Sequence, residues 1–228
     1  MTITATSLTR AAGIAAAAAG AIFIGVQINH PHLDATTIAT TEVVVRDSLK
    51  VLMAALALLG ITGMYLSQVR RNGVLGLVGF VVLAAGYVTI FSTSVVAAFV
   101  LPHLAETNPR YVDQVTAVFT GRSSTGDIGA LLTVSQVQGY AYLAGGLLFG
   151  IALYRAHVLH RWAAALLAVG GVASAVLHAM PDAFYRFLAF PNGIAMIALG
   201  WSLWTTTRTD SVTQRPVVRR PRVTVGAE

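Results

Sequence analysis

Cysteine is absent from the 228 residues of this chain. Its absence excludes structural disulfides, thiolate nucleophiles, Cys-ligated zinc and iron–sulfur clusters. Charge is scarce as well, because charged residues make up 11% of the sequence, whereas soluble domains of average composition carry about 25%. Hydrophobic residues make up 56% and fall in long runs. These proportions leave too little polar surface to cover a soluble globule and favour a protein of the lipid bilayer.

Lysine is nearly absent too, since Lys50 is the single lysine beside fourteen arginines. With so much Ala, Val and Gly, this usage is typical of a bacterial protein from a GC-rich genome. The net charge of +6 is compatible with nucleic acid as a partner. However, the arginines lie in short loops and in the C-terminal tail, beside the apolar runs. That distribution excludes nucleic acid and indicates anionic membrane lipid as the partner.

Six apolar runs divide the chain. Each holds about 18 residues or more, which at about 1.5 Å per residue crosses a hydrocarbon core of about 30 Å as a helix. We therefore expect an all-α integral membrane protein, with a six-helix transmembrane bundle over residues 1–207 and a disordered basic tail over 208–228. The first run also resembles a signal peptide, but it is longer than a typical h-region. The runs are Ala11–Ile28, Leu49–Leu66, Val74–Val100, Ile128–Tyr154, Trp162–Ala179 and Phe184–Thr205.

The basic residues predict the orientation of these six spans. Ten of them lie on the side of the two termini, and five lie on the opposite side. The positive-inside rule therefore places both termini in the cytoplasm and the chain in the inner (plasma) membrane. The acidic residues agree independently, since seven of the nine lie on the opposite, outer side.

Polar side chains inside the apolar runs concentrate in the outer halves of the spans. Since polar groups are costly in lipid, they indicate a cavity that opens to the non-cytoplasmic face, with packed glycines such as Gly146 and Gly150 closing it below. The alternative is that these polar groups form hydrogen bonds between helices. Gln138 lies about 200° around the helix from Gln136, so at least one of these two glutamines should face a neighbouring helix and not the cavity. The residues that we expect to contact a substrate are Gln27, Asn29, Gln136, Tyr140, His178 and Asn192.

Three acids at the outer ends of spans are candidate catalytic residues: Asp34, Glu106 and Asp182. A carboxyl group that is pressed against an apolar cavity has a raised pKa and can donate a proton. For any one of the three taken alone, a solvated loop charge is the better explanation. The long loop between Glu106 and Asp127 is near the length at which loops are often functional, and it is a candidate lid over the cavity.

Metal or haem binding has weaker support. His30, His32 and Asp34 alternate, which would suit a divalent cation in an extended segment, but a solvated loop explains them better. The histidines gather near the membrane surface, whereas a haem needs histidine pairs inside the bilayer. The sequence therefore predicts no metal and no other cofactor.

In size, number of spans and lack of a soluble domain, the whole chain resembles the bacterial membrane-bound type II terpene cyclases. The resemblance is architectural, and no motif carries a residue over. It implies proton-initiated cyclisation of a lipophilic, isoprenoid-like substrate, with aromatic faces stabilising carbocations. Two alternatives remain open. A small transporter or resistance protein would need a polar path through the inner half, and a structural or partner-binding membrane protein would need no site.

Overall fold

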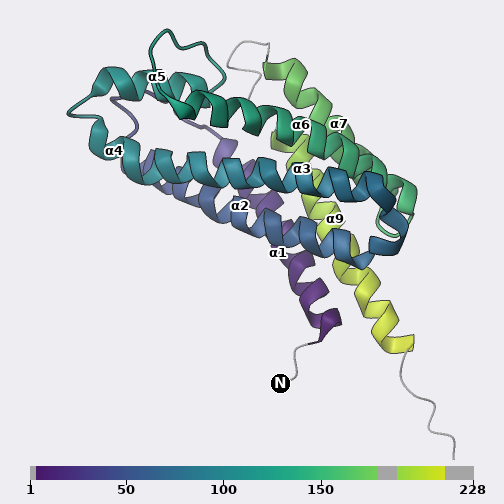
Figure 1. Ribbon diagram of the computed structural model, residues 1–228. Helices are drawn as coiled ribbons and strands as arrows, with labels where there is room; N and C mark the ends of the chain where they lie inside the picture. Colours follow the sequence, from purple (N-terminus) through teal and green to yellow (C-terminus); the bar gives the residue numbers. More distant parts are fainter. Residues whose placement is uncertain (1–3, 179–188, 214–228) are drawn as a thin grey trace, which may run out of the picture.

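The computed structural model describes residues 4–178 and 189–213, except for the side chains of 174–178 and 207–213, and all regular secondary structure in this part of the chain is helical. The predicted all-α fold is therefore confirmed. The elements are α1 (Ala5–Gln27), α2 (Thr41–Ser67), α3 (Val69–Val95), the π-helical turn η1 (Val96–Val100), α4 (Leu101–Leu104), α5 (Pro109–Phe119), α6 (Ala130–Ala156), α7 (Arg161–His178) and α9 (Ala189–Thr213) (Figure 1).

Four of these helices are long and apolar enough to cross a bilayer. They are α1, α2, α6 and the continuous rod of α3, η1 and α4, which runs from Val69 to Leu104. Within the residues whose side chains the structure describes, α7 adds a further apolar stretch, Arg161–Ala173. The last helix continues to Thr213, six residues past the boundary at 207 that the sequence suggested. The remainder of the expected tail lies outside the described residues.

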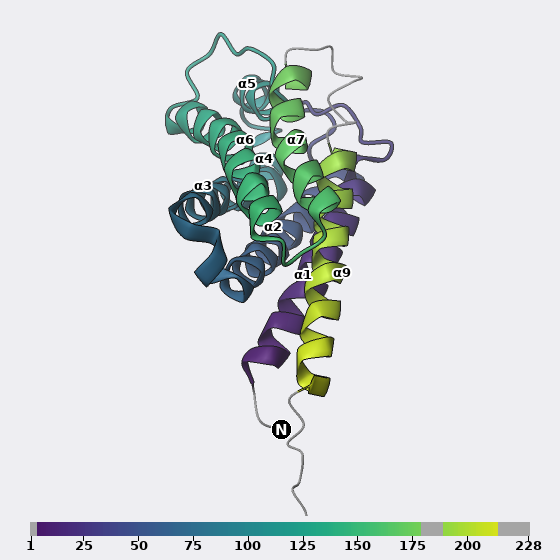
Figure 2. The same cartoon turned by 90° about the vertical axis from the view of Figure 1, so that its right-hand side faces the viewer.

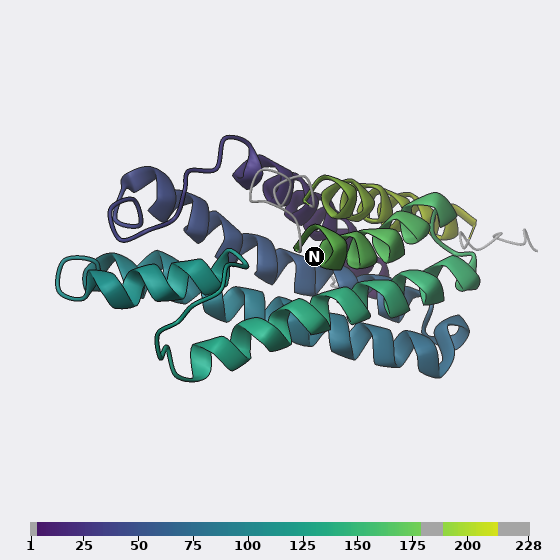
Figure 3. The same cartoon turned by 90° about the horizontal axis from the view of Figure 1, so that it is seen from above.

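The six long helices form a closed antiparallel ring. Along the chain, α1 packs against α2, α2 against α3, α3 against α6, α6 against α7 and α7 against α9. The last helix of this series, α9, packs against α1 and closes the ring (Figures 2 and 3). We call the end that carries α4 and α5 the cap end. The opposite end holds the α2–α3 and α6–α7 connections, and we call it the hairpin end (Figure 1).

Glycines set the close approach of α1 and α9, the pair that closes the ring. A β-carbon at Gly13 would lie 2.7 Å from the carbonyl oxygen of Gly200, and one at Gly193 would lie 2.8 Å from the carbonyl oxygen of Gly20. The pairing 13 with 200 and 20 with 193 follows an antiparallel register. Membrane helices associate through such small residues because the lipid supplies no hydrophobic driving force between them.

Glycine packing also joins α6 to α7. A β-carbon at Gly150 would lie 2.6 Å from the backbone nitrogen of Ala168, and one at Gly171 would lie 2.8 Å from the carbonyl oxygen of Leu143. This confirms the close helix approach that Gly146, Gly150 and the pair Gly170–Gly171 predict.

The outer surface of the ring is apolar along the helix faces that point away from it. On α2 the exposed large side chains recur every three, four or seven residues, and α3 shows a similar stripe. Water would not favour such stripes, but a bilayer would accept them. On α2 they are Val45, Leu49, Leu52, Leu59 and Leu66, and on α3 they include Val74, Leu77, Val81 and Val88.

The buried apolar side chains form two separate clusters. The inner cluster fills the middle and hairpin end of the ring, and its members include Met53, Ile61, Leu83, Phe149, Leu167 and Leu199. The cap cluster lies at the cap end and joins the 28–40 connection to η1, α4, α5 and residue 128; it includes Leu33, Ile38, Val43, Leu101, Val112 and Ile128. The prediction of a continuous loop over 106–127 is therefore wrong in part, because α5 forms within this segment.

Local sequence explains why α5 forms there. Asn108 caps the helix by accepting a hydrogen bond from the backbone N–H of Tyr111, and Pro109 occupies the first helical turn, where its missing N–H costs nothing. Val112 and Val115 are buried in the cap cluster, so one face of this short helix seals the end of the ring.

We predict that Gly20→Val destabilises the protein much more than Gly25→Val does. A β-carbon at Gly20 would collide with the carbonyl oxygen of Gly193, whereas nothing lies within 4 Å of a β-carbon at Gly25. Both changes put the same β-branched residue in α1, so helix propensity cancels. We expect Gly20→Val to cost about 1–3 kcal/mol of stability, seen as a lower thermal unfolding midpoint in detergent. Equal midpoints for the two variants would contradict the close α1–α9 packing.

Candidate functional site: a polar layer between two apolar clusters

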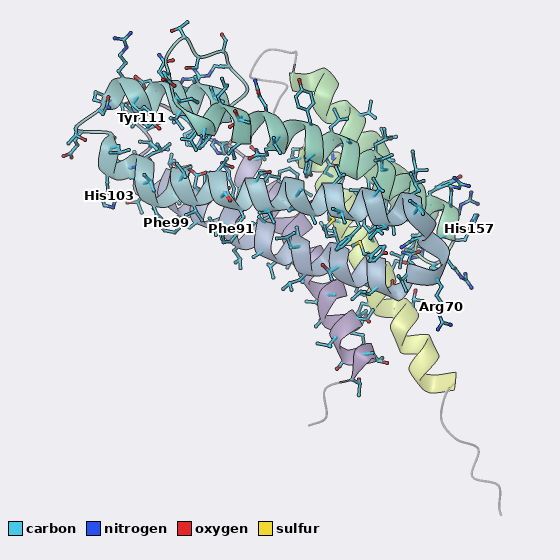
Figure 4. The ribbon with its side chains drawn as sticks, viewed as in Figure 1. Arg70, Phe91, Phe99, His103, Tyr111 and His157 are labelled. Atoms are coloured by element: carbon cyan, nitrogen blue, oxygen red, sulfur yellow. The ribbon has the colours of Figure 1, made fainter. Side chains whose placement is uncertain are left out.

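Buried polar side chains occupy a layer between the inner cluster and the cap cluster. On α2, Asp47 and Lys50 follow Val43 of the cap cluster and precede Met53 of the inner cluster. On α3, Thr93 lies between Tyr87 of the inner cluster and Ala97 of the cap cluster. We define the polar layer as the buried His30, Asp47, Thr93 and Ser94 together with the half-buried Lys50, Ser135 and Gln138 (Figure 4 shows α3 at this level, between the labelled Phe91 and Phe99).

An ion pair that extends to a histidine forms the core of this layer. The Lys50 ammonium donates to Asp47 Oδ1 over 2.7 Å and lies 3.0 Å from His30 Nε2. Asp47 is 1% exposed and His30 8% exposed. The other carboxylate oxygen of Asp47, Oδ2, is buried and has no hydrogen-bond partner. A buried acceptor without a partner carries its full desolvation cost, so this oxygen lowers the stability of the fold.

Sequence reasoning missed this group because it started the second span at Leu49, whereas α2 begins at Thr41. The charges in the first turns of α2 are compensated within the structure. Arg46 pairs with Glu42 over 2.9 Å, and its Nη1 also donates to the carbonyl oxygens of Val26 and Ile28 at the end of α1. The spacings 42–46 and 47–50 place opposite charges on one helix face, which was the available signal.

The polar layer continues from α3 to α6. The Thr93 hydroxyl donates to Gln138 Oε1 over 2.7 Å, which confirms that one glutamine of α6 faces a neighbouring helix. Ser135 Oγ is buried and has no hydrogen-bond partner. Beyond Thr93 the helix passes through the π-helical turn η1, just before Pro102, whose ring removes one backbone donor. Such turns are frequent at functional sites.

Three of the expected substrate-binding residues lie on α1 and α6. Gln27 is partly buried as the last residue of α1. Asn29 is exposed and has φ of +51°, a left-handed conformation that asparagine tolerates and that ends the helix. On α6, Gln136 is exposed.

The other three expected substrate-binding residues have different surroundings. Tyr140 is 74% exposed, on the same side of α6 as the exposed Leu132 and Val137. Asn192 is 1% exposed on α9, where its side chain fits against Gly170 of α7. His178 ends α7, but its side chain lies outside the described residues. Of the five whose side chains are described, Asn192 is therefore the one that is fully buried.

The structure gives the candidate acid Asp34 a role in local structure. Its Oδ1 accepts hydrogen bonds from the hydroxyl of Thr36 over 2.6 Å and from the backbone N–H groups of Thr36 and Thr37. The Thr36 hydroxyl has the largest effect and, with the other bonds, lowers the pKa of Asp34, while partial burial opposes the shift. A proton donor needs the opposite shift, so the raised pKa expected for Asp34 is wrong.

The structure describes one of the other two candidate acids. Glu106 is exposed in the turn between α4 and α5, and Asp182 lies outside the described residues. Among the side chains that the structure describes, no three His, Asp or Glu are close enough to hold a metal ion together. The charged site of the described structure is therefore the His30, Lys50 and Asp47 group.

Hydrogen bonds join the two segments that close the cap end of the ring. The carboxylate of Asp113 on α5 accepts a hydrogen bond from the backbone N–H of Ala35 over 2.7 Å, and Arg122 Nη2 donates to the carbonyl oxygen of Leu33 over 3.1 Å. Both join the 28–40 connection to the segment between α4 and α6, which the sequence suggested as a lid.

Comparison of the chain with protein-family models, with curated proteins and with solved structures gives no match. The site therefore has to be interpreted from its own geometry.

We predict that Thr36→Val raises the pKa of Asp34 towards its ordinary value of 3.8, because the strongest hydrogen bond to the carboxylate is lost. Since folding depresses this pKa, the turn is stabilised above about pH 4 and loses that stabilisation as the pH falls through the folded pKa. Carbon NMR titration of the Asp34 carboxyl measures the shift. Thr41→Val, which changes an exposed threonine at the start of α2, is the control, and an equal shift there would contradict the assignment.

We predict that Asp47→Asn lowers the free energy of unfolding by about 3–5 kcal/mol, because it leaves the Lys50 ammonium without its counter-charge inside the protein. The matched change Glu42→Gln removes the acid of an exposed pair on the same helix and should cost about 1 kcal/mol or less. Denaturant unfolding in mild detergent compares the two. Similar losses would show that Asp47 is not in a buried ion pair.

Proposed function

We propose that this protein is a six-span enzyme of the bacterial plasma membrane that acts on a lipophilic, isoprenoid-like substrate by proton transfer in the polar layer. The observation that carries the proposal is the buried Asp47 carboxylate, with one oxygen bound to Lys50 and the other without a partner. Ionisable groups within membrane spans are expensive to bury and mark functional sites.

Topology supports this placement. We place all six long helices across the bilayer: the four that are long and apolar enough to span it, together with α7 and α9, which complete the ring. The arginine distribution puts both termini and the hairpin end in the cytoplasm, so the cap end and the polar layer belong to the outer half. The exposed apolar faces of α2 and α3 contact lipid in this arrangement.

A lipophilic substrate fits the surroundings of the layer. Apolar clusters bound it on both sides, so only the layer itself offers polar contacts. A substrate with an apolar body and one donor group can leave that body against the clusters while its donor reaches Asp47 Oδ2. Ligand sites of this composition, mostly apolar with few placed polar groups, are typical of small-molecule pockets.

The side chains of His30, Lys50 and Asp47 are suited to acid–base chemistry. The imidazole of His30 is 3.0 Å from the ammonium of Lys50, which also binds Asp47, so a proton can pass between neighbouring hydrogen-bonded groups. An ion-paired carboxylate accepts a proton more readily than it donates one. In a proton-initiated cyclisation, Asp47 is therefore the base that ends the reaction, and Glu106 or Asp182 remains the candidate initiating acid, rather than Asp34.

Transport is less well supported. The inner cluster fills the ring between the polar layer and the hairpin end with buried side chains such as Phe149, Ile61 and Leu199. A transported solute needs a polar path through this region. The glycine contacts between α6 and α7 tighten the same region. An outer site that is closed below suits an enzyme better than a carrier.

Deuterium labelling tests the proposal. Membranes that contain the protein are incubated in heavy water, the protein is purified in mild detergent, and the lipophile that co-purifies is analysed by mass spectrometry. We expect a bound lipophile that has gained carbon-bound deuterium. Asp47→Asn should abolish the labelling, while the exposed control Glu42→Gln should retain it.

A second variant separates catalysis from folding. His30→Gln removes the titrating ring but leaves the Asp47–Lys50 pair intact, so it should bind the lipophile and label it more slowly. A lipophile that gains no deuterium with the unmodified protein would contradict enzyme action. Full labelling in both His30→Gln and Asp47→Asn would show that the proton transfer occurs elsewhere.

A further inference from the structure

The side of α6 that faces α7 carries one regular row of residues. Along this row the residues recur every three or four positions, so they lie on one face of the helix. Gly146 and Gly150 of the row pack against α7, which shows that the row points toward this neighbour. We call it the α7-facing row, and its members are Leu132, Gln136, Gly139, Leu143, Gly146 and Gly150.

The glycines of this row show that the two helices separate toward the cap end. A β-carbon at Gly150 would lie 2.6 Å from the backbone nitrogen of Ala168, and one at Gly146 would lie 3.5 Å from the α-carbon of Gly171. At Gly139, about two turns further toward the cap end, no atom of the described residues lies within 4 Å of a β-carbon. Figure 2 shows the same divergence, since the upper ends of α6 and α7 lie apart.

Burial along the row follows the same gradient. Gly146 is buried and Leu143 is half-buried, whereas Gly139, Gln136 and Leu132 are exposed, Leu132 by 44%. On a helix face that points toward a neighbour, exposure means that the neighbour no longer covers the residue. We call this part of the contact the α6–α7 opening, and on α6 it is bordered by Leu132, Gln136 and Gly139.

The α6–α7 opening lies between the polar layer and the outer surface of the ring. Ser135 of the polar layer is one helical turn from Gly139, so the two residues share a face of α6. On the outer side of the same stretch, Val137 is 46% exposed and Tyr140 is 74% exposed. A ligand that enters from the outer surface through the opening therefore arrives beside the polar layer.

The helices on both sides of the opening are free of charge. From Ala130 to Tyr154, α6 contains no charged residue, and α7 contains none from Trp162 to Leu177. A charged ligand would lose its hydration here without gaining a counter-charge, whereas an apolar chain has no such cost. Because Gly139 has no side chain, a chain can also lie directly against the backbone of α6. The chemistry of the opening therefore suits an apolar chain.

We propose that the α6–α7 opening is the route by which the apolar chain of a membrane lipophile reaches the polar layer from the bilayer, lying across Gly139. This inference rests on the membrane placement and enzyme function proposed above, and it adds the substrate's shape and its direction of approach. The substrate is a slim, chain-shaped lipophile that arrives sideways from lipid and not from the water above the cap end.

Spin labelling tests whether lipid fills the opening. Because the chain contains no cysteine, an introduced thiol carries the only label. A nitroxide at Gly139→Cys is compared, in vesicles of phosphatidylcholine and phosphatidylglycerol, with labels at three reference sites. Val81→Cys reports the exposed face of α3, Ser123→Cys an exposed connection, and Ala152→Cys a buried position on α6. Power saturation measures collisions with oxygen, which concentrates in lipid, and with a water-soluble nickel chelate.

We expect the Gly139→Cys label to collide with oxygen as often as the Val81→Cys label does, and to be shielded from the nickel chelate. Protection from both reagents, as at Ala152→Cys, would show that the opening is covered and would overturn the proposal. Nickel collisions as frequent as at Ser123→Cys would overturn it too, because the space would then hold water. Neither reading depends on deuterium labelling in the polar layer.

A bulky side chain at the same position tests the route itself. Since a β-carbon at Gly139 meets no described atom within 4 Å, Gly139→Trp should leave the thermal unfolding midpoint unchanged. We expect it to slow deuterium labelling of the lipophile at least about tenfold, as overpacking against a ligand implies. Gly25→Trp, which adds the same ring at an equally open position on α1, should leave the labelling unchanged.

The outcome of this experiment separates the route from the function. Full labelling by a folded Gly139→Trp variant would overturn the route while leaving the enzyme function intact. An equal loss of labelling in Gly25→Trp would also overturn it, because the effect would not belong to the opening. If the unmodified protein labels no lipophile, the enzyme function fails, and the spin-label collisions still decide whether the opening admits lipid.

Discussion

The contact between the first and last helices is the constraint on which the rest of this structure depends. Gly13 and Gly20 of α1 meet Gly200 and Gly193 of α9 so closely that neither side has room for a β-carbon. This contact turns a row of antiparallel helices into a ring with an inside and an outside. Without it, α1 would pack only against α2, and α9 would pack mainly against α7.

Inside that ring, polar and apolar side chains lie at different positions along the length of the helices. The inner cluster occupies the middle and the hairpin end, the cap cluster covers the opposite end, and the ionised pair of Asp47 and Lys50 lies between them. Removing two charges from water costs several kcal/mol for each ion, and their attraction in a medium of low dielectric offsets only part of this cost. A pair of well-packed apolar residues would serve stability better. A charge pair at this level, with one carboxylate oxygen left unpartnered, is therefore better explained by chemistry than by folding.

The two ends of the ring differ in how far they are closed. At the cap end, α5 and the 28–40 connection are tied together by Asp113 and Arg122 over a buried apolar cluster, which closes that side. At the hairpin end, a hollow stays open between exposed arginines.

The sequence by itself determined that the fold is helical and that several long apolar helices follow one another. Runs of about 18 apolar residues with almost no charge leave helices as the only way to pair every backbone group in lipid. It also identified the Gly146 and Gly150 packing and a glutamine of α6 facing its neighbour. It left Asp47 outside the second span and put Lys50 at the very start of that span, since hydropathy stops a span near the first charges. Only the tertiary structure decided that α2 starts eight residues earlier, because Lys50 neutralises Asp47, and Arg46 binds Glu42 and the end of α1. Likewise, α5 formed because the cap cluster gave its valines something to pack against, and a contact between segments that far apart in sequence leaves no trace in local periodicity.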